Sequence, residues 1–259
     1  MARWWVVGAL VAVTGCGLFR EVPVPAPPAA RNDDTFGTGM PASALANPRT
    51  LEWTRRLCGK SAKRAAAAYG LTRSRAQLPR LEAVLTAHGL PRALIAVPAV
   101  ESRFHADARG SHGELGIWQL RPATARRFGL EVTRGRDERM HLERSTQAAA
   151  RYLVFLHERY DDWPLAIAAY NAGEGRVDRA LARRPGATLW ELTERGGLPR
   201  RSREYVAKVL ALVRIVAAPA SCGADVPVLN AGTPGPTPVP PALRRAASSP
   251  RSCASGCAG

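Results

Sequence analysis

Proline-rich stretches near both ends of the chain restrict the part that can fold to the middle of its 259 residues. Residues 17–47 contain the run EVPVPAPPAA, and residues 223–259 contain GTPGPTPVPP. Segments of this composition bury too little apolar surface to offset the entropy lost on ordering, so we expect a tether and a low-complexity tail. The folded domain is predicted at residues 48–222, a length that suits one hydrophobic core.

Proline and glycine divide this middle part into segments with helical periodicity. Apolar residues recur at helical spacing around Leu81 and Leu85, in a segment that ends at Gly89, and again in TQAAARYLVFLHERY. No alternating strand pattern runs for more than a few residues, so the predicted fold class is mainly α. Predicted helix starts, including a Thr188–Glu191 capping box, are Pro48, Pro91, Pro122, Ser145, Pro164 and Thr188.

The predicted helix after Pro91 carries an ionisable residue in an apolar setting. Residues 93–104 read ALIAVPAVESRF, and a helix would place Glu101 on the same face as Leu94 and Val97. Burial disfavours the charged form of a carboxyl, so Glu101 on that face would have a raised pKa and could stay protonated near neutral pH. The alternative is a Glu101 that turns to solvent at the helix end. We also expect Pro98 to kink this helix.

Three short motifs follow one another in the order ES at 101–102, GIWQ at 116–119 and AYN at 169–171. In order and spacing they resemble the signature motifs of the lytic transglycosylases, which share the goose-type lysozyme fold and cleave bacterial peptidoglycan. The resemblance covers about residues 78–216, and the wording VPAVES and GIWQL is most similar to the membrane-bound lytic murein transglycosylase D group. It implies a lysozyme-like helical domain with a substrate cleft.

The resemblance also implies roles for the matching residues. Glu101 would be the single catalytic acid/base, the hydroxyl of Tyr170 would hold its carboxyl, and Tyr205 would line the cleft. The glycines would shape the loop so that its backbone approaches the sugars. The residues expected to bind substrate or shape its site are Ser102, Gly113, Gly116, Gln119, Tyr170, Asn171 and Tyr205.

The implied reaction cleaves the β-1,4 bond between N-acetylmuramic acid and N-acetylglucosamine and closes a 1,6-anhydro ring, with no cofactor or metal. Most glycosidases use two carboxylates, so a lysozyme-type hydrolase with Asp107 or Glu114 activating water is an alternative. A non-catalytic peptidoglycan-binding lipoprotein is a third interpretation. The histidines show no paired metal-binding spacing.

The N-terminal residues 1–16 have the pattern of an export signal. Their apolar stretch is too short to span a membrane but suits a signal peptide. Residues 13–16, VTGC, resemble a lipobox, which predicts lipidation of Cys16 and, because no Asp follows it, attachment to the outer membrane facing the periplasm. An ordinary secretory signal is the alternative. The net charge of +16 comes from scattered arginines, so we expect no nucleic-acid partner.

Export would place the remaining cysteines in an oxidising compartment, which permits disulfides. We predict one bridge between Cys58 and Cys222, near the two ends of the helical region, and one between Cys253 and Cys257 in the tail. The alternative is four unpaired thiols.

Overall fold

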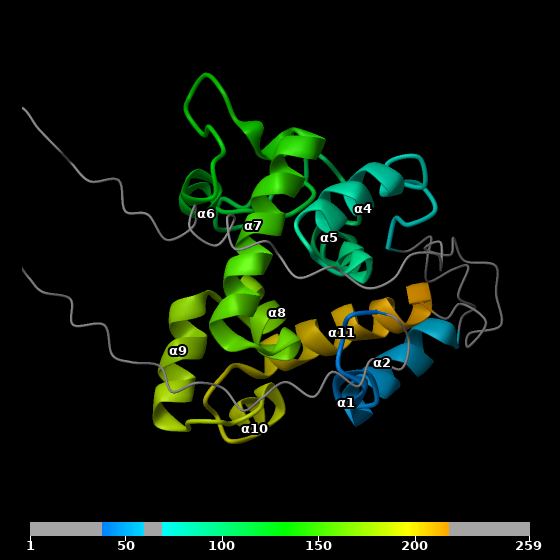
Figure 1. Cartoon of the computed structure of the whole chain (residues 1–259), viewed down its shortest axis with the longest axis vertical. Coiled ribbons are helices and arrows are strands. Elements are labelled where there is room, and N and C mark those ends of the chain that lie inside the picture. Colours follow the sequence, from blue (N-terminus) through cyan, green and yellow to red (C-terminus); the bar gives the residue numbers. More distant parts are fainter. Residues whose placement is uncertain (1–37, 60–68, 218–259) are drawn as a thin grey trace, which may run out of the picture.

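Helices make up almost all the regular structure of the computed structural model, which describes residues 38–59 and 69–217 (Figure 1). Within these ranges β-structure is limited to isolated bridges. The predicted mainly α fold class is confirmed. In chain order the helices are α1 (Ala42–Leu45), α2 (Pro48–Cys58), α4 (Leu78–Ala87), the 3-10 helix η1 (Arg92–Ile95), α5 (Ala96–Ser102), α6 (Pro122–Arg127), the 3-10 helix η2 (Glu138–Met140), α7 (Leu142–Tyr160), α8 (Trp163–Ala172), α9 (Glu174–Arg183), α10 (Leu189–Glu194) and α11 (Arg200–Ala217).

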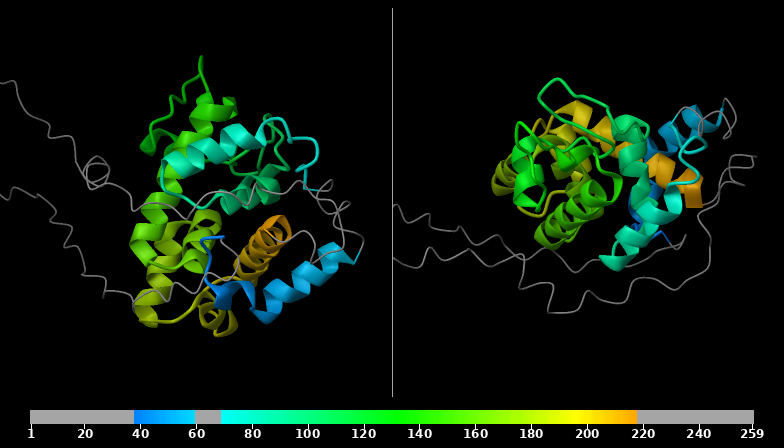
Figure 2. Two further views of the ribbon diagram at one scale, coloured as in Figure 1. Left: turned by 45° about the vertical axis from the view of Figure 1, so that its right-hand side comes forward. Right: turned by 90° about the horizontal axis from the view of Figure 1, so that it is seen from above.

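Two groups of helices meet around α7 and α8. In Figure 1, α4, α5 and α6 lie in the upper group and α1, α2, α10 and α11 in the lower one. Helix α7 packs against both α4 and α8, while α11 packs against α2, α8 and α5. Figure 2 shows α2 beside α11 in both views. Helix α11 therefore connects the lower group to α5, which carries Glu101.

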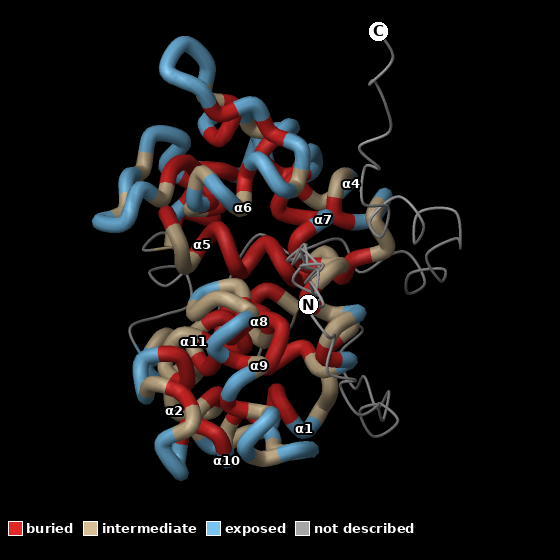
Figure 3. The backbone as a smooth tube through the Cα atoms, turned by 90° about the vertical axis from the view of Figure 1, so that its left-hand side faces the viewer, coloured by how far each residue is buried: buried red, intermediate tan, exposed pale blue. Residues whose placement is uncertain are grey.

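The core runs through α8 because that helix is apolar on every side. Residues 163–169 are all buried, and Figure 3 shows long buried stretches in α5, α8 and α11. The start of α8 is fixed by Asp162, whose Oδ1 accepts a hydrogen bond of 2.6 Å from the N–H of Leu165, and by Pro164 in the first turn. The last turn of this anchored helix carries Tyr170 and Asn171 toward the surface.

Residues 38–47, which we placed in the tether, pack against the core instead. Met40 is 1% exposed and Leu45 is fully buried. The hydroxyl of Thr50 donates a 3.0 Å hydrogen bond to the Ala44 carbonyl, and α1 contacts α11. The composition of the segment did not predict this packing, because a few buried apolar side chains are enough to hold a short segment against an existing core.

One predicted helix start and one predicted kink were also wrong. Helix α7 begins at Leu142, capped by the ring of His141, so Ser145 already lies inside the helix. We expected Pro98 to kink the helix that carries Glu101. Instead the chain changes from 3-10 to α geometry before it, at Ala96, and Pro98 lies in the first turn of α5. A first-turn residue has no intrahelical acceptor for its N–H, so proline costs nothing there. The Thr188–Glu191 capping box is confirmed.

Several predictions concern segments outside the described residues. The export signal with Cys16 belongs to these segments, as do Cys222, Cys253 and Cys257. Cys58 is disulfide-bonded, so an unpaired thiol at this position is ruled out, whereas the pairing that we predict for it stays a prediction. Across residues 38–59 and 69–217, no helix has the length and apolar character needed to span a membrane.

Candidate active site

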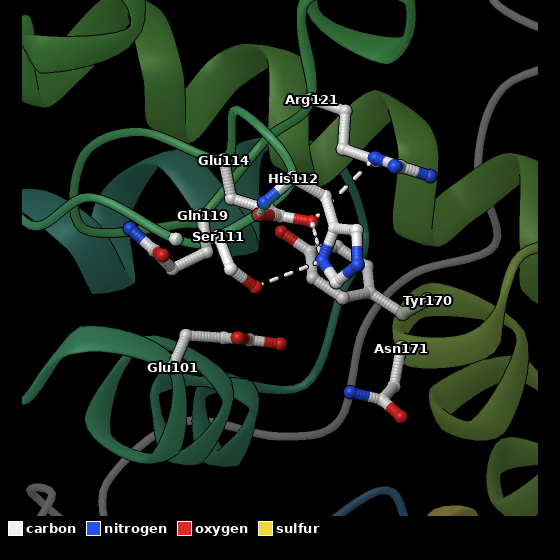
Figure 4. Close-up of a pocket in the computed structure, with 9 residues that line it drawn as sticks. Glu101, Ser111, His112, Glu114, Gln119, Arg121, Tyr170 and Asn171 are labelled. Carbon is white, nitrogen blue, oxygen red and sulfur yellow. Dashed lines mark hydrogen bonds and ion pairs between the residues drawn. The ribbon is translucent and has the colours of Figure 1, made fainter.

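A pocket of about 270 Å³ opens between the ends of two helices and the loop that joins α5 to α6 (Figure 4). In Figure 4, Glu101 comes from α5 below the pocket, Glu114 from the loop above it, and Asn171 from the end of α8. The lining residues are Glu101, Gly110, Ser111, His112, Glu114, Gln119, Arg121, Tyr170 and Asn171.

Glu101 lies in the last turn of α5 with its side chain half-buried. Leu94 and Val97 are fully buried, which confirms the apolar face that periodicity predicted. Burial raises the pKa of Glu101 to about 7, although a hydrogen bond from Tyr205 opposes the rise; the negative charge of Glu114 adds to it. Glu101 can therefore both hold and release a proton near neutral pH, as a general acid/base must.

The carboxyl of Glu101 is held by Tyr205, and the role that we expected for Tyr170 is corrected. The Tyr205 hydroxyl donates a hydrogen bond of 2.6 Å to Oε1 of Glu101, because α11 packs against α5 and brings this side chain to the carboxyl. The Tyr170 hydroxyl instead donates to the backbone carbonyl of Trp118 at 2.8 Å. Burial raises the pKa of both tyrosines well above 10, so both hydroxyls keep their protons.

Ser102, which we expected to bind sugar, is buried and does not line the pocket. Its hydroxyl lies 2.8 Å from the carbonyl oxygen of Ile117 and 3.3 Å from that of Pro98. The serine thus ties the end of α5 to the GIWQ segment. It fixes the distance between the helix that carries Glu101 and the loop opposite.

Gln119 lines the pocket in a fixed orientation. Its amide nitrogen donates to the carbonyls of Ala108 (2.9 Å) and Gly116 (2.8 Å), and its backbone takes a left-handed φ of 47°. A Cβ at Gly110 would lie 3.1 Å from the amide oxygen of Gln119, so glycine leaves that oxygen room. With both amide hydrogens engaged, the oxygen remains as an acceptor for a donor in the pocket.

Gly113 and Gly116 belong to contacts that hold the loop in shape. Gly116 has a φ of 80°, and a Cβ there would lie 2.2 Å from the carbonyl oxygen of Arg139. The buried Arg139 guanidinium donates from Nη1 to the carbonyls of Gly113 (2.6 Å) and Leu120 (2.9 Å). Neither glycine lines the pocket. The sequence did not predict a role for Arg139, because no motif or spacing distinguishes it from the other arginines.

Glu114 is the member of the pocket that sequence reasoning undervalued. The N–H of His112 donates to its Oε2 at 2.8 Å, and Arg121 lies 3.5 Å from Oε1. Burial acts to raise the pKa of Glu114, but hydrogen bonds from its own N–H and that of His112, with the charges of His112 and Arg121, lower it overall. Asp107, the other candidate second carboxylate, is exposed and does not line the pocket.

The described part of the chain holds no group of three or more potential metal ligands. The pocket itself offers a carboxyl with a near-neutral pKa, an ionised carboxylate and the amides of Gln119 and Asn171. This combination suits proton transfer to and from an uncharged polar substrate.

Comparisons with known proteins agree with this chemistry. Residues 81–192 match the family model described as Transglycosylase SLT domain. Membrane-bound lytic murein transglycosylase D of Escherichia coli K12 is 40% identical over 132 residues, which are 49% of this chain and 28% of that protein. Membrane-bound lytic murein transglycosylase F of Pseudomonas fluorescens is 32% identical over 125 residues, 44% of this chain and 24% of that protein.

A solved structure of an inactive mutant of lytic transglycosylase Slt from Pseudomonas aeruginosa is 28% identical, with a TM-score of 0.46 over 63% of this chain and 25% of that one. The chain thus matches about a quarter of the length of the relatives named here. The family-model match over residues 81–192 and the identity to transglycosylase D confirm the resemblance read from the three motifs.

Proposed function

We propose that this chain, whose residues 81–192 match the transglycosylase SLT domain, is a peptidoglycan lytic transglycosylase. It would cleave the β-1,4 bond between N-acetylmuramic acid and N-acetylglucosamine and leave a 1,6-anhydro-muramyl end. The observation that carries the proposal is Glu101, a pocket carboxyl whose pKa burial raises to about 7. The names of the relatives, both lytic murein transglycosylases, support the substrate class.

The reaction needs one group that first gives and then takes a proton. Protonated Glu101 donates to the glycosidic oxygen as its bond to the muramyl C1 breaks, and the neighbouring N-acetyl oxygen stabilises the positive charge at C1. The Glu101 carboxylate then removes the proton of the C6 hydroxyl while that oxygen bonds to C1. No water is consumed, and Glu101 ends in its starting form.

Other residues of the site support these two steps. The Tyr205 hydroxyl, 2.6 Å from Oε1, stabilises the Glu101 carboxylate that exists between them. Gln119 and Asn171 line the pocket with amide groups that suit sugar hydroxyls and N-acetyl groups, and we assign both to substrate binding. Ser102, Gly113 and Gly116 keep their place in the site as supports of its loop.

Digestion of purified sacculi tests the proposal, with the released muropeptides identified by mass spectrometry. We expect products that end in 1,6-anhydro-muramic acid, and a parallel sample of the Glu101→Gln protein controls for contaminating enzymes. A product carries an anhydro end or a reducing end according to whether O6 or water attacked C1, so the two are distinguished by the mass of one water.

A lysozyme-type hydrolase is the second candidate, and Glu114 is the observation that favours it. This carboxylate lines the same pocket as Glu101, and its lowered pKa keeps it in the ionised form that a water-activating base needs. Reducing-end products in the same digestion would select the hydrolase. Binding to sacculi without release of any product would select a non-catalytic peptidoglycan-binding protein.

We also propose that the chain is an exported lipoprotein, with a signal peptide at residues 1–16, lipid on Cys16 and residence in the outer membrane facing the periplasm. Residues 17–37 would then act as the tether and residues 223–259 as a low-complexity tail, around a catalytic domain that ends near residue 222. The names of two relatives, which call them membrane-bound, support an envelope location. Fatty-acid labelling that the Cys16→Ser protein retains would contradict the lipid attachment.

The disulfide that Cys58 forms supports export to an oxidising compartment. We assign Cys222 as its partner and propose a second bridge between Cys253 and Cys257. Peptide mapping of the non-reduced protein identifies both pairs. A Cys58 peptide linked to any other cysteine would contradict the assignment.

A further inference from the structure

We propose that Glu114 is a positioning residue of this site: its ionised carboxylate, fixed across the pocket from Glu101, holds the proton on Glu101, and Arg121 limits how strongly it does so. The inference rests on the proposed function for its catalytic meaning. It assigns a role in that function to a residue outside the three motifs, and it explains why the loop places a carboxylate beside a basic side chain.

The first argument is that Glu114 is held in place. Its Oε2 accepts the N–H of His112 at 2.8 Å, and its own backbone carbonyl accepts the N–H of Gly110 at 2.9 Å. A Cβ at Gly110 would lie only 2.4 Å from Oε2, so glycine makes the room that the carboxylate occupies. A charge fixed in this way acts on the pocket in every molecule, unlike that of a mobile surface side chain.

The second argument is that the two carboxyls of the pocket are driven to opposite protonation states. Burial raises the pKa of Glu101, and the charge of Glu114 raises it further. Burial acts in the same direction on Glu114, but N–H donors and the nearby Arg121 and His112 outweigh it and lower that pKa. Pairs of titratable groups separated in this way are characteristic of acid/base sites.

The third argument comes from the other groups that act on Glu101. From α11, the Tyr205 hydroxyl stabilises the charged form of Glu101. From α8, Tyr170 is a neutral phenol whose hydroxyl is used by the carbonyl of Trp118. Among the residues that line the pocket, Glu114 is the acidic group besides Glu101 itself, and Arg121 and His112 are the basic ones.

The sign of the effect follows from charge alone. A negative Glu114 disfavours a second negative charge, so its removal by Glu114→Gln lowers the pKa of Glu101. Arg121 lies 3.5 Å from Glu114 and offsets part of its charge, so Arg121→Gln raises the pKa of Glu101. Damage to the loop would move both variants in one direction. Opposite shifts from two partners of one ion pair are therefore specific to the electrostatic role.

The test measures the titration of Glu101 directly, by the carboxyl carbon resonance of the 13C-glutamate-labelled full-length protein without substrate. The Glu101→Gln spectrum assigns the resonance. We expect Glu114→Gln to lower the pKa of Glu101 by roughly 0.4 unit, about a 2.5-fold change in proton affinity, as for one like charge across a solvated pocket. We expect a smaller rise for Arg121→Gln.

Two control variants separate this role from general charge effects. Glu194→Gln removes the same charge from an exposed site that does not line the pocket, and should leave the Glu101 titration unchanged. His112→Asn keeps the backbone N–H that holds Glu114 and removes the ring beside it. We expect Glu114→Gln to lower the pKa of Glu101 in the His112→Asn protein as well. Loss of this shift would identify the His112 ring, and not Glu114, as its source.

The pH dependence of muropeptide release is the second readout, and its alkaline limb should move with the titration in each variant. An unshifted Glu101 resonance in Glu114→Gln would overturn the proposal, as would shifts of the same sign in the Glu114 and Arg121 variants. Loss of turnover at every pH with a normal titration would instead make Glu114 a reacting group. If the wild type released nothing from sacculi, the proposed function would fail while the titration still decided the role of Glu114.

Discussion

The pocket has a helical wall, formed by α5 and α8 and backed by α11, and a loop wall formed by residues 110–121. Each wall contributes one carboxyl. The helical wall places Glu101 among apolar side chains with a single donor from Tyr205, and burial keeps its proton affinity high. The loop wall places Glu114 among N–H groups and cations, with its side chain 23% exposed, and its proton affinity is low. The pKa of a carboxyl is thus raised by the helical wall and lowered by the loop wall.

The largest expected effect comes from removing the proton donor of the helical wall. Glu101→Gln keeps the shape of the side chain and can still accept from Tyr205, so the protein should fold and bind sacculi. Release of anhydro-muropeptides should fall by about 10² to 10⁴, the usual contribution of a general acid/base. Glu101→Asp retains a carboxyl and should keep more activity than the glutamine variant. Near-normal release by Glu101→Gln would remove Glu101 from the reaction.

The second prediction separates the two tyrosines that meet the helical wall. Tyr205→Phe removes the 2.6 Å hydrogen bond to Glu101 and should slow the reaction by about 10- to 150-fold, or roughly 1.5 to 3 kcal/mol for a bond to a charged group. Because that bond favours the carboxylate, its loss should also shift the alkaline limb of the pH profile to higher pH.

Tyr170→Phe is the matched control, since its hydroxyl donates to the Trp118 carbonyl and not to Glu101. The pH profile of this variant should stay where it is in the wild type. A displaced profile for Tyr170→Phe together with a normal one for Tyr205→Phe would reverse the assignment made from the structure.

The contrast between the walls also explains what could be read from the sequence. Helix starts with Pro164 or the Thr188 capping box, and the apolar face that carries Glu101, follow from local patterns, and the structure confirms them. Which tyrosine reaches Glu101 depends on the packing of α11 against α5, between residues 104 positions apart, and local patterns do not encode it.

The structure of the loop wall could not be predicted from the sequence to the same extent. Its shape depends on backbone positions with positive φ and on the buried Arg139, which binds carbonyls of the loop. The acceptors in these contacts are backbone carbonyls, which every residue has. The sequence pattern therefore does not predict which residues make them. Glu114 accordingly resembled an ordinary surface charge, and residues 38–47 resembled a continuation of the tether.

The third prediction disrupts the loop wall alone. Gly116→Ala would force a Cβ to within 2.2 Å of the Arg139 carbonyl oxygen at a φ of 80°. We expect the free energy of unfolding to fall by about 1 to 3 kcal/mol, measured by urea denaturation. Gly135→Ala is the control, because no atom lies within 4 Å of a Cβ built there. Equal stability of the two variants would show that the loop does not depend on this contact.

The smallest effect is the dependence of stability on pH, and it should have opposite signs for the two walls. Glu101 has a pKa of about 7 in the folded protein against an ordinary value of 4.5, so the folded state binds the proton more tightly. Its contribution to stability is complete below about pH 4.5 and is lost as the pH rises through about 7, at no more than about 1.4 kcal/mol per pH unit.

Glu114 has a lowered pKa, so its contribution to stability is present above the ordinary value of 4.5 and is lost as the pH falls below it. The free energies of unfolding of the wild type, Glu101→Gln and Glu114→Gln, measured by urea denaturation from about pH 2.5 to 8, give the contribution of each carboxyl by difference. Relative to the wild type, Glu101→Gln should gain stability as the pH rises toward about 7, whereas Glu114→Gln should gain it as the pH falls below 4.5. A Glu101→Gln difference that stays flat between pH 4.5 and 7 would mean that the helical wall does not desolvate its carboxyl, and the acid role of Glu101 would lose its physical basis.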